Sequence, residues 1–183
     1  MTSMRLLDKL TANKIRDGDV RAYEELINAH KDRVFNYCLR MAGNYHLAEE
    51  LAQEVFVKVF RGIGSYDWRK AALSTWIYTI SHNTCLNYLR NSRKEQHQAF
   101  EETYMDKYPS AEEQYLVIED RERMIKALNA LPPEERELVL MKDYLELKYR
   151  EVGQITGVPA GTVKSRLHQV RAKIRRLLGD GDE

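Results

Sequence analysis

The apolar residues in the first half of the chain recur at intervals of three and four, the spacing of a buried face on an α-helix. Asp19 is the candidate N-cap of the first long helix, and Gly43-Asn44 ends it. The next helix has the cleanest pattern, with apolar residues at i, i+3, i+4, i+7, i+8, i+11 and i+12. They are Ala48, Leu51, Ala52, Val55, Phe56, Val59 and Phe60. Strand-like alternation is almost absent, so the pattern predicts helices throughout.

Two segments interrupt these helical periods. Residues 62–74 form a loop of Gly, Ser, aromatic and charged residues, and a further helix is predicted from Ser74 to the basic stretch 90–94. The stretch from Glu95 to Asp120 holds eight acidic residues against one Lys. A stretch this rich in charged residues has too little apolar surface to bury a core of its own. We therefore expect a flexible acidic linker over 95–113 between two domains, 1–94 and 114–183.

Three short helices are predicted near the C-terminus, over 134–144, 148–156 and 162–178. Gly157 suits the left-handed conformation at a helix end, and Pro159 cannot continue the first of the two flanking helices. Thr162 can cap the last helix. A short turn between two helices, the second of them basic, is typical of a helix-turn-helix that places its second helix in the DNA major groove.

The last helix has an apolar and a polar face. The expected buried stripe consists of Val163, Leu167, Val170, Ile174, Leu177 and Leu178. The polar residues near its start can donate to or pair with base edges, and they are Lys164, Ser165, His168 and Gln169. The residues placed for phosphates are Arg166, Arg171, Arg175 and Arg176. A solvated basic helix is the alternative, and the turn residues favour DNA binding.

Composition fits a soluble folded protein, with 43% hydrophobic and 31% charged residues and a net charge of +1 over 183 residues. Cys38 and Cys85 form no CxxC motif, so we expect free thiols in a reducing compartment, and a redox role for either stays open. No apolar run approaches the roughly 20 residues that cross a bilayer, and no signal peptide is evident. We expect a cytoplasmic protein.

Catalytic and metal-binding patterns are missing from the sequence. His30 lies on an apolar stripe, where a packed histidine is expected, and no histidine is spaced from a cysteine as metal ligands are. There is no phosphate-binding Gly-rich loop, nucleophile elbow or catalytic carboxylate pair. The sequence therefore predicts no metal, no cofactor, no small-molecule substrate and no enzymatic activity.

Two blocks of sequence resemble one known family. GTVKSRL at 161–167, preceded by Leu131-Pro132 and by YREV at 149–152, resembles region 4 of the extracytoplasmic-function (ECF) sigma factors. AEELAQEVF at 48–56 resembles region 2.2, and STWIY at 74–78 resembles the start of region 2.4. The resemblance implies an all-α protein of two small helical domains. It also implies a factor that binds RNA polymerase core and directs promoter-specific transcription initiation.

The resemblance assigns roles by position. The residues implied to dock on a coiled coil of a large polymerase subunit are Glu50, Gln53, Glu54 and Lys58, for which a solvated face is the alternative. Those implied to recognise and melt the −10 element are Tyr66, Trp68, Ser74, Asn83, Asn87 and Arg90. Those implied to bind the −35 element are Thr162, Lys164, Ser165, Arg166, His168, Gln169 and Arg171. Trp68 could instead cap the loop, and Trp76 is assigned to the core.

The family pattern also implies a partner and shows departures. Members are commonly held inactive by an anti-sigma factor, often anchored in the membrane, and we expect one here. The linker would pass through a polymerase channel, which its acidity fits as well as it fits plain disorder. Leu73 stands where Phe is usual. Gly153 replaces the usual Ala, which should weaken its helix by about 0.5–1 kcal/mol.

Two rival hypotheses make different predictions. A stand-alone helix-turn-helix regulator would bind an operator without polymerase, but it would not need the N-terminal motif blocks. An enzyme with a DNA-binding appendage would need catalytic groupings, which the sequence lacks.

Overall fold

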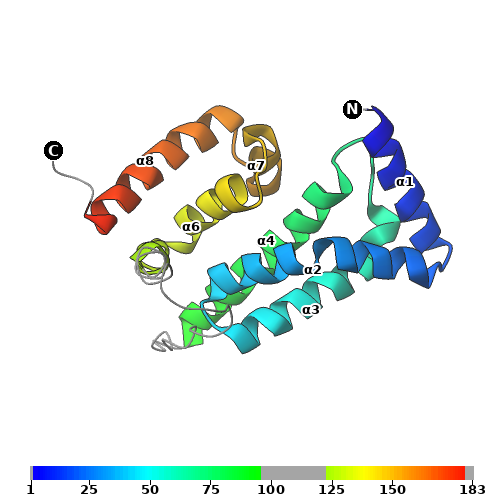
Figure 1. Ribbon diagram of the computed structural model, residues 1–183, viewed down its shortest axis with the longest axis horizontal. Helices are drawn as coiled ribbons and strands as arrows, with labels where there is room; N and C mark the ends of the chain where they lie inside the picture. The colour runs from blue at the N-terminus through cyan, green and yellow to red at the C-terminus, as the bar shows by residue number, and fades with distance from the viewer. Residues whose placement is uncertain (1, 96–122, 180–183) are drawn as a thin grey trace, which may run out of the picture. The chain divides into compact units, whose positions relative to one another are not determined.

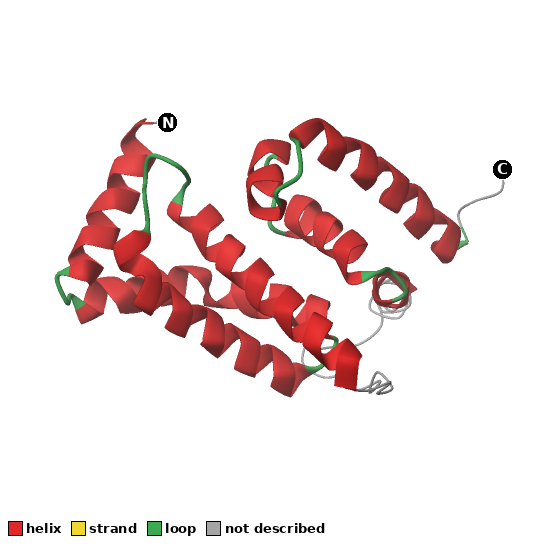
Figure 2. Ribbon diagram, turned by 180° about the vertical axis from the view of Figure 1, so that it is seen from behind, coloured by secondary structure: helices red, strands yellow, loops and turns green. Residues whose placement is uncertain are grey.

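A computed structural model describes residues 2–95 and 123–179, and all the regular secondary structure in these ranges is helical (Figures 1 and 2). The chain divides into two compact units, Met1–Ala99 (unit 1) and Phe100–Glu183 (unit 2). The predicted all-α fold with two helical domains is thereby confirmed. Apart from Glu95, which ends a helix, the predicted linker and its flexibility lie outside the described residues.

Unit 1 is a bundle of three long helices with a shorter one across its end (Figure 1). The elements are α1 (Thr2–Arg16), α2 (Val20–Ala42), α3 (Tyr45–Gly62), the 3-10 turn η1 (Ile63–Ser65) and α4 (Leu73–Glu95). Helices α2, α3 and α4 pack against one another, while α1 packs on α2 and η1. The loop over 66–72 connects η1 to α4 and lies beside α1.

The helix ends of unit 1 follow from short polar residues and one glycine. The Asp19 carboxylate accepts a hydrogen bond from the Ala22 N–H at 3.1 Å, which confirms Asp19 as the N-cap of α2. Gly43 ends α2 with a φ of 70°, a left-handed conformation that costs glycine little. Asn44 then caps α3 by accepting from the Leu47 N–H at 2.9 Å. The chain therefore reverses between α2 and α3 within two residues.

The core of unit 1 lies where α2, α3 and α4 face one another. Its fully buried side chains include Val34, Tyr37, Cys38, Met41, Val55, Val59, Ile77 and Cys85. His30 packs edge-on against Tyr78 with 6.2 Å between ring centroids, which fits the expected packed histidine. The apolar pattern placed Phe60 on the buried stripe of α3, and this prediction was wrong, because the Phe60 side chain is 54% exposed. The apolar stripe of α3 is wider than the surface that α2 and α4 cover, and Phe60 lies at its edge.

Unit 2 contains the C-terminal helices. Residues 123–129 are helical and are followed by α6 (Pro133–Val139), the single π-helical turn η2 (Leu140–Tyr144), α7 (Tyr149–Thr156) and α8 (Ala160–Leu178). Together α6 and η2 span the predicted helix 134–144. The buried side chains include Leu131, Leu138, Met141, Val152, Ile155, Val163, Leu167, Val170 and Ile174. Leu177 was expected in this core but is 49% exposed, because it lies on the last turn of α8.

Candidate nucleic-acid interface

The turn between α7 and α8 has the geometry of a helix-turn-helix. Gly157 ends α7 with a φ of 72°, as its position after the apolar period predicted. α8 begins at Ala160, two residues earlier than expected, because the Pro159 carbonyl already accepts from the Val163 N–H at 3.0 Å. Thr162 therefore lies inside the first turn, and its prediction as the N-cap was wrong. Its carbonyl accepts instead from the Ser165 hydroxyl at 3.0 Å.

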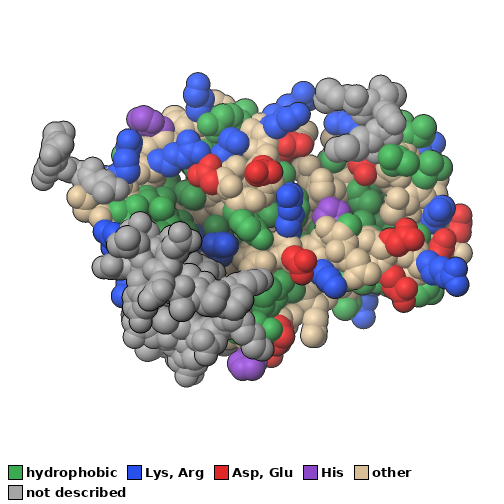
Figure 3. Space-filling model, viewed as in Figure 1, with side chains coloured by type: hydrophobic (Ala, Val, Ile, Leu, Met, Phe, Trp, Pro, Cys, Tyr) green, Lys and Arg blue, Asp and Glu red, His purple; other side chains and the backbone are tan. Residues whose placement is uncertain are grey.

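α8 presents its polar residues to solvent. Val163, Leu167 and Val170 are buried, so the opposite face is exposed. The exposed residues from the predicted −35 set are Lys164, Ser165, Arg166, His168, Gln169 and Arg171, whereas Thr162 is half-buried. On the face shown in Figure 3, Lys and Arg side chains gather along α8. The structure thus keeps the predicted residues on one helix and turned outward.

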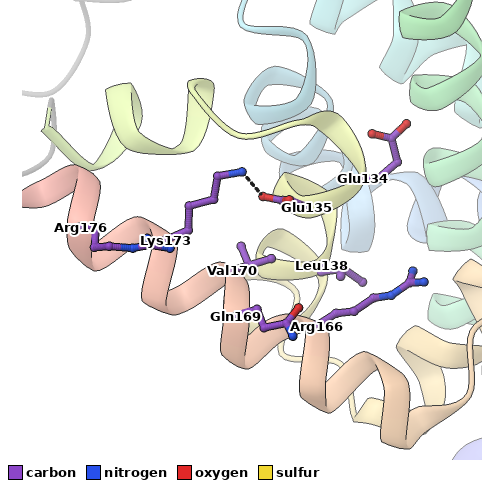
Figure 4. Close-up of a pocket in the computed structure, with 8 residues that line it drawn as sticks. All are labelled: Glu134, Glu135, Leu138, Arg166, Gln169, Val170, Lys173 and Arg176. Atoms are coloured by element: carbon purple, nitrogen blue, oxygen red, sulfur yellow. Dashed lines mark hydrogen bonds and ion pairs between the residues drawn. The ribbon is translucent and has the colours of Figure 1, made fainter. Parts of the chain in front are cut away.

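Acidic residues of α6 lie next to one flank of α8. A groove of about 400 Å³ lies between the two helices (Figure 4). It is lined by Glu134, Glu135, Leu138, Arg166, Gln169, Val170, Lys173 and Arg176. The Lys173 ammonium donates to the Glu135 carboxylate at 2.9 Å. The lining thus mixes two carboxylates with three cationic side chains, so Glu134 and Glu135 reduce the positive charge that this flank offers to a DNA backbone. Lys164, Ser165 and His168 do not line the groove.

Arg171 is held within unit 2. Its guanidinium pairs with the Asp143 carboxylate of η2, with 3.4 Å between Arg171 Nε and Asp143 Oδ2. This hydrogen bonding raises the pKa of Arg171 above its ordinary value. A phosphate at this position would share the guanidinium with Asp143, which the sequence pattern did not reveal because 28 residues separate the two.

The four predicted polymerase-binding residues lie together on the exposed side of α3. Glu50, Gln53, Glu54 and Lys58 are all exposed. The Lys58 ammonium pairs with the Glu54 carboxylate at 2.6 Å and also donates to the Thr84 hydroxyl of α4 at 3.1 Å. Lys58 therefore ties α3 to α4 and reduces the free negative charge on the face.

Two apolar residues, which the sequence analysis did not assign to the polymerase-binding face, extend this exposed face of α3. Val57 is 46% exposed and Phe60 54% exposed, one and two turns beyond Gln53. The Phe60 ring lies 5.0 Å from the Tyr23 ring, whose hydroxyl donates to the Phe56 carbonyl at 2.6 Å. The available signal was their spacing, because Val57 lies four residues after Gln53 and Phe60 three residues after Val57. An apolar residue in an amphipathic pattern is, however, assigned to the core first.

The 66–72 loop holds the two aromatic residues predicted at the −10 element, and the two differ in burial. Tyr66 is 4% exposed, its hydroxyl donates to the Ala71 carbonyl at 3.0 Å, and its ring lies 5.3 Å from that of Trp76. Burial raises the pKa of Tyr66. Tyr66 thus supports the loop from inside and offers no free ring face to a base. Trp68 is half-buried, with the Lys9 ammonium 5.3 Å from its ring centroid.

The remaining predicted −10 residues lie on α4. Asn83, Asn87 and Arg90 are exposed and, at spacings of four and three, share one face. Ser74 is half-buried in the first turn. Within the 66–72 loop, hydrogen bonds from Arg69 lower the pKa of Asp67 to about 2, so Asp67 stays charged.

Sequence comparison identifies the family. The chain matches Sigma-70 region 2 over residues 26–95 and Sigma-70 region 4 over residues 121–174. It is 35% identical over 180 residues to the ECF RNA polymerase sigma factor SigE of Mycolicibacterium smegmatis, covering 93% of this chain and 69% of SigE. The chain belongs to the ECF sigma factors. It is an alternative sigma factor that directs transcription initiation.

Other relatives of this sigma factor cover nearly its whole length. SigW of Bacillus subtilis is 29% identical, with 97% of this chain and all of SigW aligned. Among solved structures, CnrH in complex with the cytosolic domain of CnrY has a TM-score of 0.72, at 16% identity and with 96% and 99% of the chains covered. RpoE in complex with the anti-sigma factor NepR from Bartonella quintana has a TM-score of 0.70, at 21% identity and with 86% and 96% covered. These structures share the fold of this sigma factor.

The described residues offer neither a metal site nor a membrane-spanning helix. No group of three or more His, Cys, Asp or Glu in residues 2–95 and 123–179 could hold a metal ion. Within the same ranges, no helix is both long and apolar enough to span a membrane.

Proposed function

We propose that this sigma factor divides promoter recognition between its two units, with the −35 element bound by α8 and the −10 element bound and opened by unit 1. The observation that carries the proposal is the sidedness of α8. Val163 and Leu167 are buried, while Lys164, Ser165 and His168 on the other side are exposed and lie outside the groove between α6 and α8. A helix with this arrangement can enter the major groove without exposing apolar surface.

In unit 2, the residues differ in what they offer to DNA. Lys164 and His168 can donate to base edges, and Ser165 can donate or accept. Gln169 and Arg166 line the groove beside Glu134, so they would reach DNA from the flank of α8. Arg171 would contact a phosphate from its pair with Asp143. Thr162, whose carbonyl receives the Ser165 hydroxyl, would position Ser165.

In unit 1, the −10 strand would follow α4 from the loop toward the C-terminal end of that helix. Asn83 and Asn87 offer amide donors and acceptors to unpaired bases, and Arg90 offers charge to the backbone. Trp68 offers an aromatic surface to an extruded base, whose unstacking costs a few kcal/mol. Ser74 would add a small hydroxyl donor, and Tyr66 would hold the loop from beneath.

The α3 face would bind RNA polymerase core. Glu50, Gln53 and Glu54 give it acidic and amide groups that suit a basic coiled coil, and Lys58 fixes Glu54 in place. Val57 and Phe60 add exposed apolar surface beside them, which a partner helix could bury.

The proposal also covers catalytic activity, location and a regulatory partner. The chain would carry no catalytic activity of its own, because polymerase performs the chemistry. It would act in the cytoplasm, where polymerase and chromosomal DNA are found. CnrH and RpoE are each described in complex with a partner, CnrY or the anti-sigma factor NepR, which supports an anti-sigma factor as a partner here, one that could hold this chain at the membrane.

Run-off transcription with purified core polymerase tests the proposal. Core supplied with this chain should transcribe from a randomised promoter library, and core alone should not. The chain should also co-elute with core on a sizing column. A stand-alone regulator would instead bind DNA tightly without core and yield no promoter-dependent transcript. That outcome would overturn the proposal.

Matched variants separate the two units. Lys164→Ala should relax base preference at one −35 position by about 1–3 kcal/mol, while the exposed Lys126→Ala in the same unit should leave it unchanged. Glu54→Ala should weaken core binding and leave DNA binding by α8 intact. Gln53→Ala, which keeps the Glu54–Lys58 pair, should act in the same direction, and the exposed Glu25→Ala on α2 serves as the control.

A further inference from the structure

Helix α1 forms hydrogen bonds to the segment that leads into the 66–72 loop. The Arg16 side chain donates from Nε to the Ile63 carbonyl at 3.0 Å and from Nη2 to the Tyr66 carbonyl at 2.7 Å. One planar guanidinium thus fixes two backbone carbonyls, three residues apart, at the point where η1 gives way to the loop. Its third contact, to the Asn13 side chain at 3.2 Å, keeps Arg16 oriented from within α1.

The same helix also holds the far end of the loop. The Asp8 carboxylate accepts from the Leu73 N–H at 3.0 Å, across 65 residues of sequence. Leu73 is the first residue of α4, and the first turn of α4 contains no acidic residue. The first N–H groups of a helix have no partner within it and favour negative charge nearby. Asp8 therefore caps α4 from another helix.

Two more contacts of α1 lie between these ends. Arg5 donates from Nη1 to the Arg69 carbonyl at 3.1 Å, and the Lys9 ammonium sits over the Trp68 ring. The four side chains Arg5, Asp8, Lys9 and Arg16, which we name the α1 brace, therefore touch the loop at its start, its middle and its end. The match to Sigma-70 region 2 begins at residue 26, so the α1 brace lies outside it.

We propose that the α1 brace sets the conformation of the 66–72 loop before DNA binds and thereby determines base preference at the −10 element. Arg16 and Asp8 act as positioning residues, since they hold loop backbone rather than DNA. The inference rests on the proposed function, in which this loop meets the −10 strand. Ordering the backbone of a loop costs conformational entropy, so a loop of seven residues that is ordered in advance spares much of this cost on binding.

The first test measures the loop without any promoter. Hydrogen exchange of the 66–73 amides in the full-length chain should be at least about tenfold faster in Arg16→Ala than in the wild type, because its two charged hydrogen bonds are lost. Arg16→Lys, which can donate to one carbonyl at a time, should fall between them. Lys14→Ala, an exposed change on the same helix, is the control and should match the wild type. Unchanged exchange in Arg16→Ala would overturn the brace.

The second test measures base preference with holoenzyme on a library randomised at both promoter elements. Arg16→Ala should flatten the preference at the −10 positions by about tenfold and leave the −35 preference unchanged. A loss of total transcript with the −10 preference intact would mean that Arg16 serves stability alone, which overturns the inference. If the wild type itself shows no promoter-dependent transcript, the proposed function fails, and the exchange result still reports on the brace.

A milder variant covers the case in which Arg16→Ala does not fold. Arg5→Ala combined with Lys9→Ala removes two partly exposed contacts and leaves Arg16 and Asp8 in place. It should raise loop exchange and flatten the −10 preference by a few-fold. A wild-type profile in both measurements would contradict the proposal.

Discussion

The Sγ atoms of Cys38 and Cys85 lie 3.6 Å apart between α2 and α4, although 47 residues separate them in the chain. Both side chains are fully buried. Because the thiolate is the reactive form and neither sulfur meets solvent, both thiols should resist alkylation in native buffer. Mass spectrometry after iodoacetamide treatment should show no adduct in native buffer and two in guanidinium chloride. Labelling of the native protein faster than its unfolding would contradict this burial.

Gly153→Ala should destabilise unit 2 although alanine is the better helix former. A Cβ at this position would lie 2.5 Å from the Val158 carbonyl oxygen, which belongs to backbone and cannot rotate away. The gain in helix propensity, about 1 kcal/mol, should be outweighed by overpacking of about 1–3 kcal/mol. Urea unfolding of the variant should show a lower midpoint, whereas Gln154→Ala on the same helix should not. A raised midpoint for Gly153→Ala would refute the close approach.

Arg136→Met should weaken unit 2 more than a surface change does. Arg136 is 3% exposed and donates to the carbonyls of Leu128 and Asn129 at 2.9 Å each and to that of Leu131 at 3.3 Å. Its removal leaves buried acceptors without these donors, and the free energy of unfolding should fall by roughly 2–4 kcal/mol. Calorimetry should show a lower Tm for unit 2, with the exposed Arg150→Met as a control near wild type.

His30 should make unit 1 less stable as the pH falls below about 6.5. Burial, followed by the nearby Arg33, lowers the pKa of His30, and Asp8 opposes this shift. The unfolded chain therefore takes up a proton near the ordinary pKa while the folded chain does not. Stability is full above that value and declines until the lower pKa of the folded state is reached. The buried Nδ1 of His30 has no hydrogen-bond partner within the part of the chain that the structure describes.

His30→Gln should flatten this decline in denaturant titrations between pH 7 and 5. The matched change His46→Gln, at a side chain that is 90% exposed, should leave the decline in place. If both variants keep the wild-type profile, another group causes it.

Much of the molecule could be predicted from local chemistry. Asp19, Gly43 and Gly157 mark helix ends because capping and left-handed φ depend on the residue itself. The outward faces of α3 and α8 also follow from the helical spacing of their apolar residues alone. Glu54 and Lys164 lie on these faces and are exposed, as predicted. The start of α8 was misplaced because Pro159 accepts the first helical hydrogen bond, which its sequence position does not reveal.

Contacts between distant segments could not be predicted in this way. Phe60 was assigned to the core because nothing in α3 indicates how much surface its neighbours cover. Gly153 was interpreted as a weak helix residue, whereas the backbone of the following turn requires it. Tyr66 was a candidate for base contact until the packing of Trp76 and the Ala71 carbonyl placed it inside.

The sequence by itself determined that this protein has two helical units, a helix-turn-helix and the motifs of an ECF sigma factor, because period, caps and motif spacing are local properties. Tertiary structure alone decided that Arg16 and Asp8 hold the 66–72 loop, that Arg171 pairs with Asp143 and that two distant thiols touch. These relationships join residues 28 to 65 positions apart. They depend on how helices pack, and packing is a property of several segments together that no single pattern contains.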